Sequence, residues 1–118
     1  MLNAGKLLGK IENGVANTTE KRLLRIMTPV MKLFTAKEAV SFISEGLECF
    51  GAMGYMENSS IPVYLRDAQV LPIWEGTTNV LSLDLVRALQ RDKECISALA
   101  QEVRIAVDQL SSASGNDS

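Results

Sequence analysis

ECFGAMGY at residues 48–55 and YLRDAQVLPIWEGTTNV at residues 64–80 are the two stretches that decide how this chain folds. The first contains a small-residue turn at Gly51, Ala52 and Gly54, where a backbone can be approached closely because glycine has no side chain and accepts positive φ. On both sides of these stretches, apolar residues recur at the helical spacing of three and four. The turn is therefore expected to lie between packed helices.

Glu75 is a lone carboxylate between the apolar run Leu71–Trp74 and Gly76. Apolar neighbours favour the neutral form of a carboxyl group, which is the tuning that a general base near neutral pH needs. A simpler interpretation is that Glu75 only precedes a helix, where its negative charge meets the positive end of the helix dipole. The residues alone leave both interpretations open.

Three motifs, in order, resemble the C-terminal helical domain of the flavin-dependent acyl-CoA dehydrogenases. They are GAMGY from Gly51, Arg66-Asp67-Ala68, and IWEGTTN from Ile73 to Asn79. The residues of the last motif resemble the alkylation-response branch of that family more closely than its straight-chain fatty-acid enzymes. The resemblance implies an all-α fold, an up-and-down helical bundle over residues 1–110.

The resemblance also implies an activity. Glu75 would be the catalytic base that removes the α proton of an acyl-CoA thioester while a hydride leaves the β carbon for FAD. Its backbone N–H would polarise the thioester carbonyl, and Gly76 would line the acyl site. The acyl chain of the substrate stays open.

Two segments match the family's flavin contacts. Thr77, Thr78 and Asn79 match positions that contact the flavin nucleotide. Glu48, Gly51 and Ala52 belong to the segment that holds the dinucleotide portion, characteristically from a neighbouring subunit, so a homo-oligomer is expected. The chain departs from the family pattern at Glu48, Ala52 and Trp74, where glutamine, glycine and tyrosine are usual. The negative charge of a carboxylate at Glu48 is unfavourable beside a pyrophosphate.

The composition is that of one ordinary globular domain: 118 residues, 47% hydrophobic, 22% charged and only 5% aromatic. The net charge of −2 gives no global basic surface for nucleic acid. The absence of histidine excludes histidine-based zinc sites and Ser-His or Cys-His nucleophile pairs. Cys49 and Cys95 lack metal spacing and are expected to be free thiols of a reducing compartment, the cytoplasm or the mitochondrial matrix.

Periodicity and capping signals predict the helices. Thr35-Ala36-Lys37-Glu38 has the form of a capping box, so a helix is expected to begin there, and a Ser/Thr cap is expected near Thr18. Pro29 is expected to kink its helix. The expected helices span residues 2 to about 16, 19–34, 35–50 and 62–68, then one capped by Thr77 or Thr78 that contains Leu81, Leu85 and Leu89, and one at about 93–110. A disordered tail is expected at 111–118.

Each helix is expected to bury one apolar face. The face of the first contains Ala4, Leu8, Ile11 and Val15, with Leu7 beside them; that of the second contains Leu23, Met27, Val30 and Phe34; that of the last is a seam of Ile96, Leu99, Val103, Ala106 and Leu110. This last seam fits a bundle edge or a partner helix equally well. No transmembrane segment is expected.

Two cationic features have alternative interpretations. Lys21, Arg25 and Lys32 fall on the polar face of the second helix, which is either a solvated surface or a contact for CoA phosphates or nucleic acid; nucleic acid is not favoured. Arg66 is either an ordinary ion-pair donor or a structural anchor for the Glu75 loop. The anchor is favoured, because a guanidinium can brace several carbonyls at once.

The full enzyme of this family also needs an N-terminal helical domain and a central β domain. We therefore expect these 118 residues to be inactive alone and to act with the remaining acyl-CoA dehydrogenase domains. The alternative is a non-catalytic helical module derived from that family, which binds a partner protein or DNA.

Overall fold

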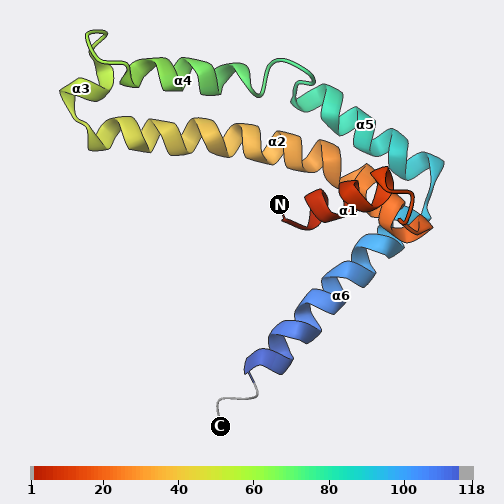
Figure 1. Cartoon of the computed structure of the whole chain (residues 1–118). Helices are drawn as coiled ribbons and strands as arrows, with labels where there is room; N and C mark the ends of the chain where they lie inside the picture. Colours follow the sequence, from red (N-terminus) through yellow and green to blue (C-terminus); the bar gives the residue numbers. More distant parts are fainter. Residues whose placement is uncertain (1, 115–118) are drawn as a thin grey trace. The chain divides into compact units, whose positions relative to one another are not determined.

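The computed structural model describes residues 2–114, and within this range every regular element is an α-helix (Figure 1). The all-α prediction is confirmed. None of the helices among the described residues is long and apolar enough to cross a membrane. The helices are α1 (Leu2–Glu12), α2 (Thr18–Cys49), α3 (Ala52–Tyr55), α4 (Ile61–Val70), α5 (Thr78–Arg91) and α6 (Glu94–Ser114).

The predicted break at Thr35 is wrong, because α2 is one helix of 32 residues. The Thr35 hydroxyl donates a hydrogen bond to the carbonyl oxygen of Met31 at 2.8 Å, one turn back along the same helix. A threonine side chain used in this way does not cap a new helix start. Pro29 lies inside α2.

A genuine capping box begins α2, but its cap is Asn17 and not the expected serine or threonine. The Asn17 side-chain oxygen accepts the Glu20 N–H at 2.9 Å, and the Glu20 carboxylate accepts the Asn17 N–H at 2.9 Å. The two groups thus satisfy each other's free backbone donors. Upstream, α1 ends at Glu12 instead of residue 16, because Gly14 turns the chain with φ 71°.

The described residues form two compact units. The terminal unit contains residues 2–28 and 85–114, and the central unit contains residues 29–84. In the terminal unit, Ile26, Ala88 and Cys95 form one buried cluster, and Leu85 and Leu89 pack against it.

The predicted apolar faces are only partly buried. In α1, Ala4 and Leu7 are buried and Leu8 is exposed; Val15 is also exposed and lies beyond the end of the helix. In α2, Leu23 and Ile26 are buried, but Val30 and Phe34 are exposed.

The last helix differs most from its prediction. Its predicted seam is exposed throughout, from Ile96 at 59% to Leu110 at 72%, and Cys95 and Ala98 are the residues that α6 buries. The helix also continues through Ser114, four residues beyond the predicted end at 110. The remainder of the predicted disordered tail, residues 115–118, lies outside the described residues.

Glycines make the reversal from α2 into α3 and α4 in the central unit. Gly51 has φ 56°, a conformation that L side chains rarely adopt. Gly54 is buried so tightly against the end of α2 that a Cβ there would lie 2.1 Å from the Leu47 carbonyl oxygen. After this reversal, α4 runs back beside the second half of α2 and delivers the chain to the Glu75 loop (Figure 1).

Candidate functional site

The loop between α4 and α5 contains a strained backbone at Glu75. Its φ is 53°, and Glu75 is the non-glycine residue with positive φ among the described residues. The neighbouring Gly76 has φ 118°. A left-handed conformation costs an L-residue roughly 1–2 kcal/mol. Such strain persists only where surrounding contacts hold it, and it clusters at active and ligand-binding sites.

The contact that holds this loop comes from α2. The Lys32 ammonium donates hydrogen bonds to the carbonyl oxygens of Leu71, Trp74 and Gly76, each at 2.8 Å. An ammonium has three N–H donors, so all of them are used. Hydrogen bonds from a charged donor are roughly twice as strong as neutral ones. Lys32 therefore fixes the backbone on both sides of Glu75.

Arg66 does not have the predicted anchoring role. Its guanidinium forks onto the Glu57 carboxylate, with Nη1–Oε1 at 2.7 Å and Nη2–Oε2 at 3.1 Å. This pair lowers the pKa of Glu57 and raises that of Arg66. The anchor prediction is thus wrong in its residue: a lysine from α2 braces the loop, and Arg66 is an ordinary ion-pair donor.

The prediction that Lys21, Arg25 and Lys32 share one basic face on α2 is wrong for Lys32. Lys21 and Arg25 are exposed, but Lys32 is half-buried and its charge is committed to the loop carbonyls. A helical wheel places Lys32 opposite the apolar face of α2, and it carries no information about a loop that returns some forty residues later.

Glu75 lies beside a hollow of about 300 Å³ in the central unit. The indole of Trp74 is 57% exposed, and the Glu75 side chain is also exposed. The hollow is lined by Lys32, Thr35, Ala36, Leu71, Trp74 and Glu75. One wall is therefore the α2 surface around Lys32, and the other is the strained loop itself.

The residues after Glu75 lead directly into α5. Gly76 is half-buried, and a Cβ at this position would lie 2.9 Å from Cδ2 of Leu81. The Thr77 carbonyl accepts the Leu81 N–H at 3.0 Å, which starts the helix. Thr77 and Asn79 are exposed, and Thr78 is half-buried. The five predicted site residues from Glu75 to Asn79 are consecutive in sequence and form the end of the loop and the start of α5.

The other predicted cofactor residues lie elsewhere. Glu48, Gly51 and Ala52 are exposed at the end of α2 and the start of α3. Within the central unit this is the opposite end of α4 from the Glu75 loop (Figure 1). The 10 residues of α4 correspond to roughly 15 Å at the rise of an α-helix. Within one chain, the structure does not join the two predicted flavin segments.

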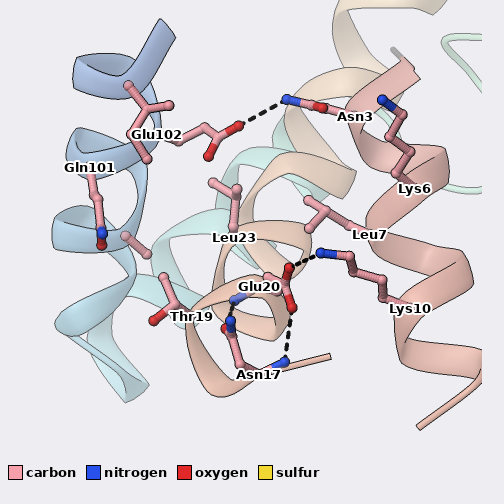
Figure 2. Close-up of a pocket in the computed structure, with 12 residues that line it drawn as sticks. Asn3, Lys6, Leu7, Lys10, Asn17, Thr19, Glu20, Leu23, Gln101 and Glu102 are labelled. Carbon is pink, nitrogen blue, oxygen red and sulfur yellow. Dashed lines mark hydrogen bonds and ion pairs between the residues drawn. The ribbon is translucent and has the colours of Figure 1, made fainter. Parts of the chain in front are cut away.

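A second hollow, of about 340 Å³, lies in the terminal unit among α1, the start of α2 and α6 (Figure 2). The Asn3 amide donates to the Glu102 carboxylate at 2.9 Å across it. Lys10 pairs with Glu20 at its other side, which, together with the Asn17 N–H, lowers the pKa of Glu20. No motif pointed to this hollow, since its walls come from opposite ends of the sequence.

A third hollow, also in the terminal unit, is basic. Four cationic side chains and one acid line it: Lys21, Arg22, Arg25, Arg91 and Asp92. Arg22 Nε donates to Asp92 Oδ2 at 2.6 Å, and this bond lowers the pKa of Asp92 and raises that of Arg22. Part of its positive charge is therefore neutralised internally.

Comparison with known proteins places the site in a family. The sequence profile of the acyl-CoA dehydrogenase C-terminal domain matches residues 8–90. Acyl-CoA dehydrogenase family member 11 of Caenorhabditis elegans is 50% identical over 103 residues, which are 87% of this chain and 17% of that protein. AidB of Escherichia coli K12, from the alkylation-response branch, is 33% identical over 73% of this chain and 16% of its own length.

The fold agrees with the sequence comparisons. The crystal structure of Caenorhabditis elegans ACDH-11 in complex with C11-CoA matches with a TM-score of 0.83 and 50% identity, over 86% of this chain and 17% of that one. The chain thus spans about a sixth of the length of these relatives. Members of this family are FAD-dependent, bind acyl-CoA and form oligomers. The family resemblance seen in the motifs is confirmed: the chain belongs to the acyl-CoA dehydrogenase family, whose C-terminal helical domain it contains.

Proposed function

We propose that this chain supplies the catalytic base and part of the flavin site of an FAD-dependent acyl-CoA dehydrogenase. The observation that supports this most directly is the strained Glu75, with φ 53° and with the carbonyls on both sides of it held by Lys32. Backbone strain that is held in place by surrounding contacts clusters at active and ligand-binding sites, which supports a functional role for Glu75.

In the proposed reaction, the Glu75 carboxylate accepts the α proton of an acyl-CoA thioester. Gly76 borders the acyl group in this proposal, and a side chain at this position would meet Leu81. The backbone N–H of Glu75 donates to the thioester oxygen as negative charge develops there. FAD, when bound, accepts the hydride that leaves the β carbon.

The residues fit FAD unequally. Thr77 and Asn79 expose a hydroxyl and an amide, with no acidic side chain between them, so they suit a nucleotide. Gly51 is open on its Cβ side, which suits close approach of a phosphate to the backbone. The exposed carboxylate of Glu48 does not suit a pyrophosphate, because the two charges repel. We therefore assign the dinucleotide contact to Gly51 and Ala52 and leave Glu48 out of it.

The separation of the two flavin segments supports a homo-oligomer in which each flavin is contacted by two subunits. Residues 48–52 and 77–79 lie at opposite ends of α4 (Figure 1). The N-terminal helical and central β domains of the family are the further partners.

A domain exchange with the Caenorhabditis elegans relative tests the catalytic proposal. The residues of that protein aligned with this chain are replaced by this chain, and acyl-CoA oxidation is followed with an electron-accepting dye. We expect the exchanged enzyme to bind FAD and turn over, and Glu75→Gln to abolish turnover while FAD content stays unchanged. Turnover that survives Glu75→Gln in a flavin-loaded enzyme would disprove the role of Glu75. FAD titration of this chain by itself, compared with Thr77→Ala, then shows how much of the flavin site is preformed.

A non-catalytic interaction module is the second candidate, and the exposed α6 seam is the observation that favours it. Ile96, Leu99 and Val103 are each more than 40% exposed. Loss of self-association in Ile96→Asp with Val103→Asp, together with no effect of Glu75→Gln in the exchanged enzyme, would favour this module over the dehydrogenase.

A further inference from the structure

We propose that Lys32 is a positioning residue that orients and polarises the two backbone N–H groups on either side of Gly76, those of Glu75 and Thr77. This inference rests on the proposed function. It states that a side chain of α2 makes the backbone N–H groups of the loop stronger hydrogen-bond donors.

The first step is the identity of the three carbonyls that Lys32 contacts. Each carbonyl shares a planar peptide group with the N–H of the following residue. The Trp74 carbonyl belongs to the peptide that carries the Glu75 N–H, and the Gly76 carbonyl to the one that carries the Thr77 N–H. The third carbonyl, of Leu71, precedes Pro72, which has no N–H. Lys32 therefore acts on two peptide donors only, and both lie in the candidate site.

The second step is direction. In a trans peptide, the C=O and N–H bonds point to opposite sides. Because the Trp74 and Gly76 oxygens lie 2.8 Å from the Lys32 ammonium, the N–H groups of Glu75 and Thr77 point away from Lys32. Within residues 2–114, neither N–H donates to a protein acceptor, whereas the N–H groups of Ile73 and Trp74 both bond to the Val70 carbonyl. The loop thus presents two available donors.

The third step is strength. A cation that bonds to a carbonyl oxygen polarises the whole peptide group, so its N–H becomes a better donor, and chained hydrogen bonds strengthen one another. A donor aimed at a developing oxyanion is the type of group that lowers the barrier of thioester chemistry. The same ammonium also holds Glu75 at φ 53°, so the donor and the base are set by a single side chain.

Nuclear magnetic resonance of the full 118-residue chain tests this without flavin. In the wild type, we expect the Lys32 ammonium protons to be visible, slowly exchanging and coupled across hydrogen bonds to the carbonyl carbons of Trp74 and Gly76. Lys32→Met should move the amide proton signals of Glu75 and Thr77 upfield and leave that of Ile73 in place. Lys37→Met, at an exposed position of the same helix, is the matched control and should change neither.

Kinetics in the exchanged enzyme separate this inference from the proposed function. Lys32→Met should lower kcat about tenfold to a hundredfold, as expected for a weakened oxyanion donor, with little change in KM, and Lys32→Arg should recover part of the loss. If Glu75→Gln abolishes turnover but Lys32→Met does not lower it, the base is right and the Lys32 inference is wrong. Rapid exchange of the wild-type Lys32 ammonium, equal to that of Lys37, would also overturn it, even if the variant failed to fold.

Discussion

At the scale of single residues, Glu75 holds a backbone conformation that suits glycine better than glutamate. Its φ of 53° costs stability, and its carboxylate is exposed to solvent. Strain of this kind is stable only where neighbouring contacts compensate for it. Lys32 supplies the compensating contacts at the neighbouring carbonyls.

This strain predicts a difference between two variants that both remove the carboxylate. Glu75→Gly should be more stable than Glu75→Ala by about 1 kcal/mol, because glycine adopts positive φ without a Cβ clash. Urea unfolding followed by circular dichroism measures the difference. Equal stability of the two variants would show that residue 75 is not held in the left-handed conformation.

Gly54 carries the second prediction at this scale. A Cβ there would meet backbone atoms of Leu47, with the oxygen at 2.1 Å, and backbone cannot move aside as a side chain can. Gly54→Ala should therefore lower the free energy of unfolding by about 1–3 kcal/mol. Gly46→Ala is the matched control: it lies inside α2 with nothing within 4 Å, and should raise stability by up to about 1 kcal/mol. Opposite signs in the two variants are the expected result.

At the scale of elements, two sequences of the same capping pattern behave differently. Asn17 and Glu20 form a reciprocal capping box at the start of α2. Thr35 and Glu38 have the same spacing, but Thr35 bonds back to Met31 inside a continuing helix. Asn13 and Gly14 break the chain before Asn17, whereas no glycine or proline stands between residues 30 and 35. A cap pattern needs a preceding chain break to act as a cap.

Alanine substitutions should show this difference. Asn17→Ala should lower the free energy of unfolding by about 1 kcal/mol, since the Glu20 N–H loses the side-chain oxygen that accepts it. Thr35→Ala should change it by less than about 0.5 kcal/mol, because the carbonyl it contacts is already bonded within the helix. Thermal unfolding of the two variants compares the sites, and a larger loss for Thr35→Ala would contradict the continuous α2.

The ion pair between α2 and the α5–α6 turn makes stability depend on pH. Arg22 lowers the pKa of Asp92 below its ordinary value, so the pair stabilises the folded state above about pH 4, the value for an unfolded aspartate. That stabilisation is lost as pH falls through the lower folded pKa. We expect the midpoint temperature of unfolding to decrease as the pH is lowered from about 5 to about 3, the range in which carboxyl groups titrate. Arg22→Met should make this decrease smaller. Arg87→Met, at an exposed position of α5, should leave the pH dependence unchanged.

At the scale of the whole molecule, the chain exposes many large apolar side chains. Phe42 is 81% exposed, Tyr55 86% and Leu110 72%. Exposed apolar area of this kind marks surfaces that other chains or domains cover. The chain spans about a sixth of its relatives, and the family forms oligomers, so such surfaces are expected.

Sedimentation velocity over a range of concentrations tests this. We expect the chain to self-associate, and Ile96→Asp with Val103→Asp to reduce the association without loss of helix content, because both side chains are exposed in α6. Arg104→Asp, on the same helix, is the control for added negative charge. Association unchanged by the double variant would place the contact on another surface.

The sequence by itself determined the helical class, the glycine turn at Gly51 and the family, and it predicted the segment from Glu75 to Asn79 as the candidate site. These are local patterns or short motifs, and the interactions that express them lie within a few residues along the chain. The continuity of α2 does not follow from the capping pattern at Thr35, because that pattern acts as a cap only where a chain break precedes it.

Only the tertiary structure decided which cation braces the loop and which faces are buried. Lys32 contacts carbonyls 39, 42 and 44 residues away, and helical periodicity specifies a face but not its partner. Ile96 and Ala98 lie two residues apart, yet Ile96 is exposed and Ala98 is buried. Which face of a helix is buried depends on which other element packs against it. Contacts between distant segments depend on the path of the whole chain, and this is the part that local patterns do not encode.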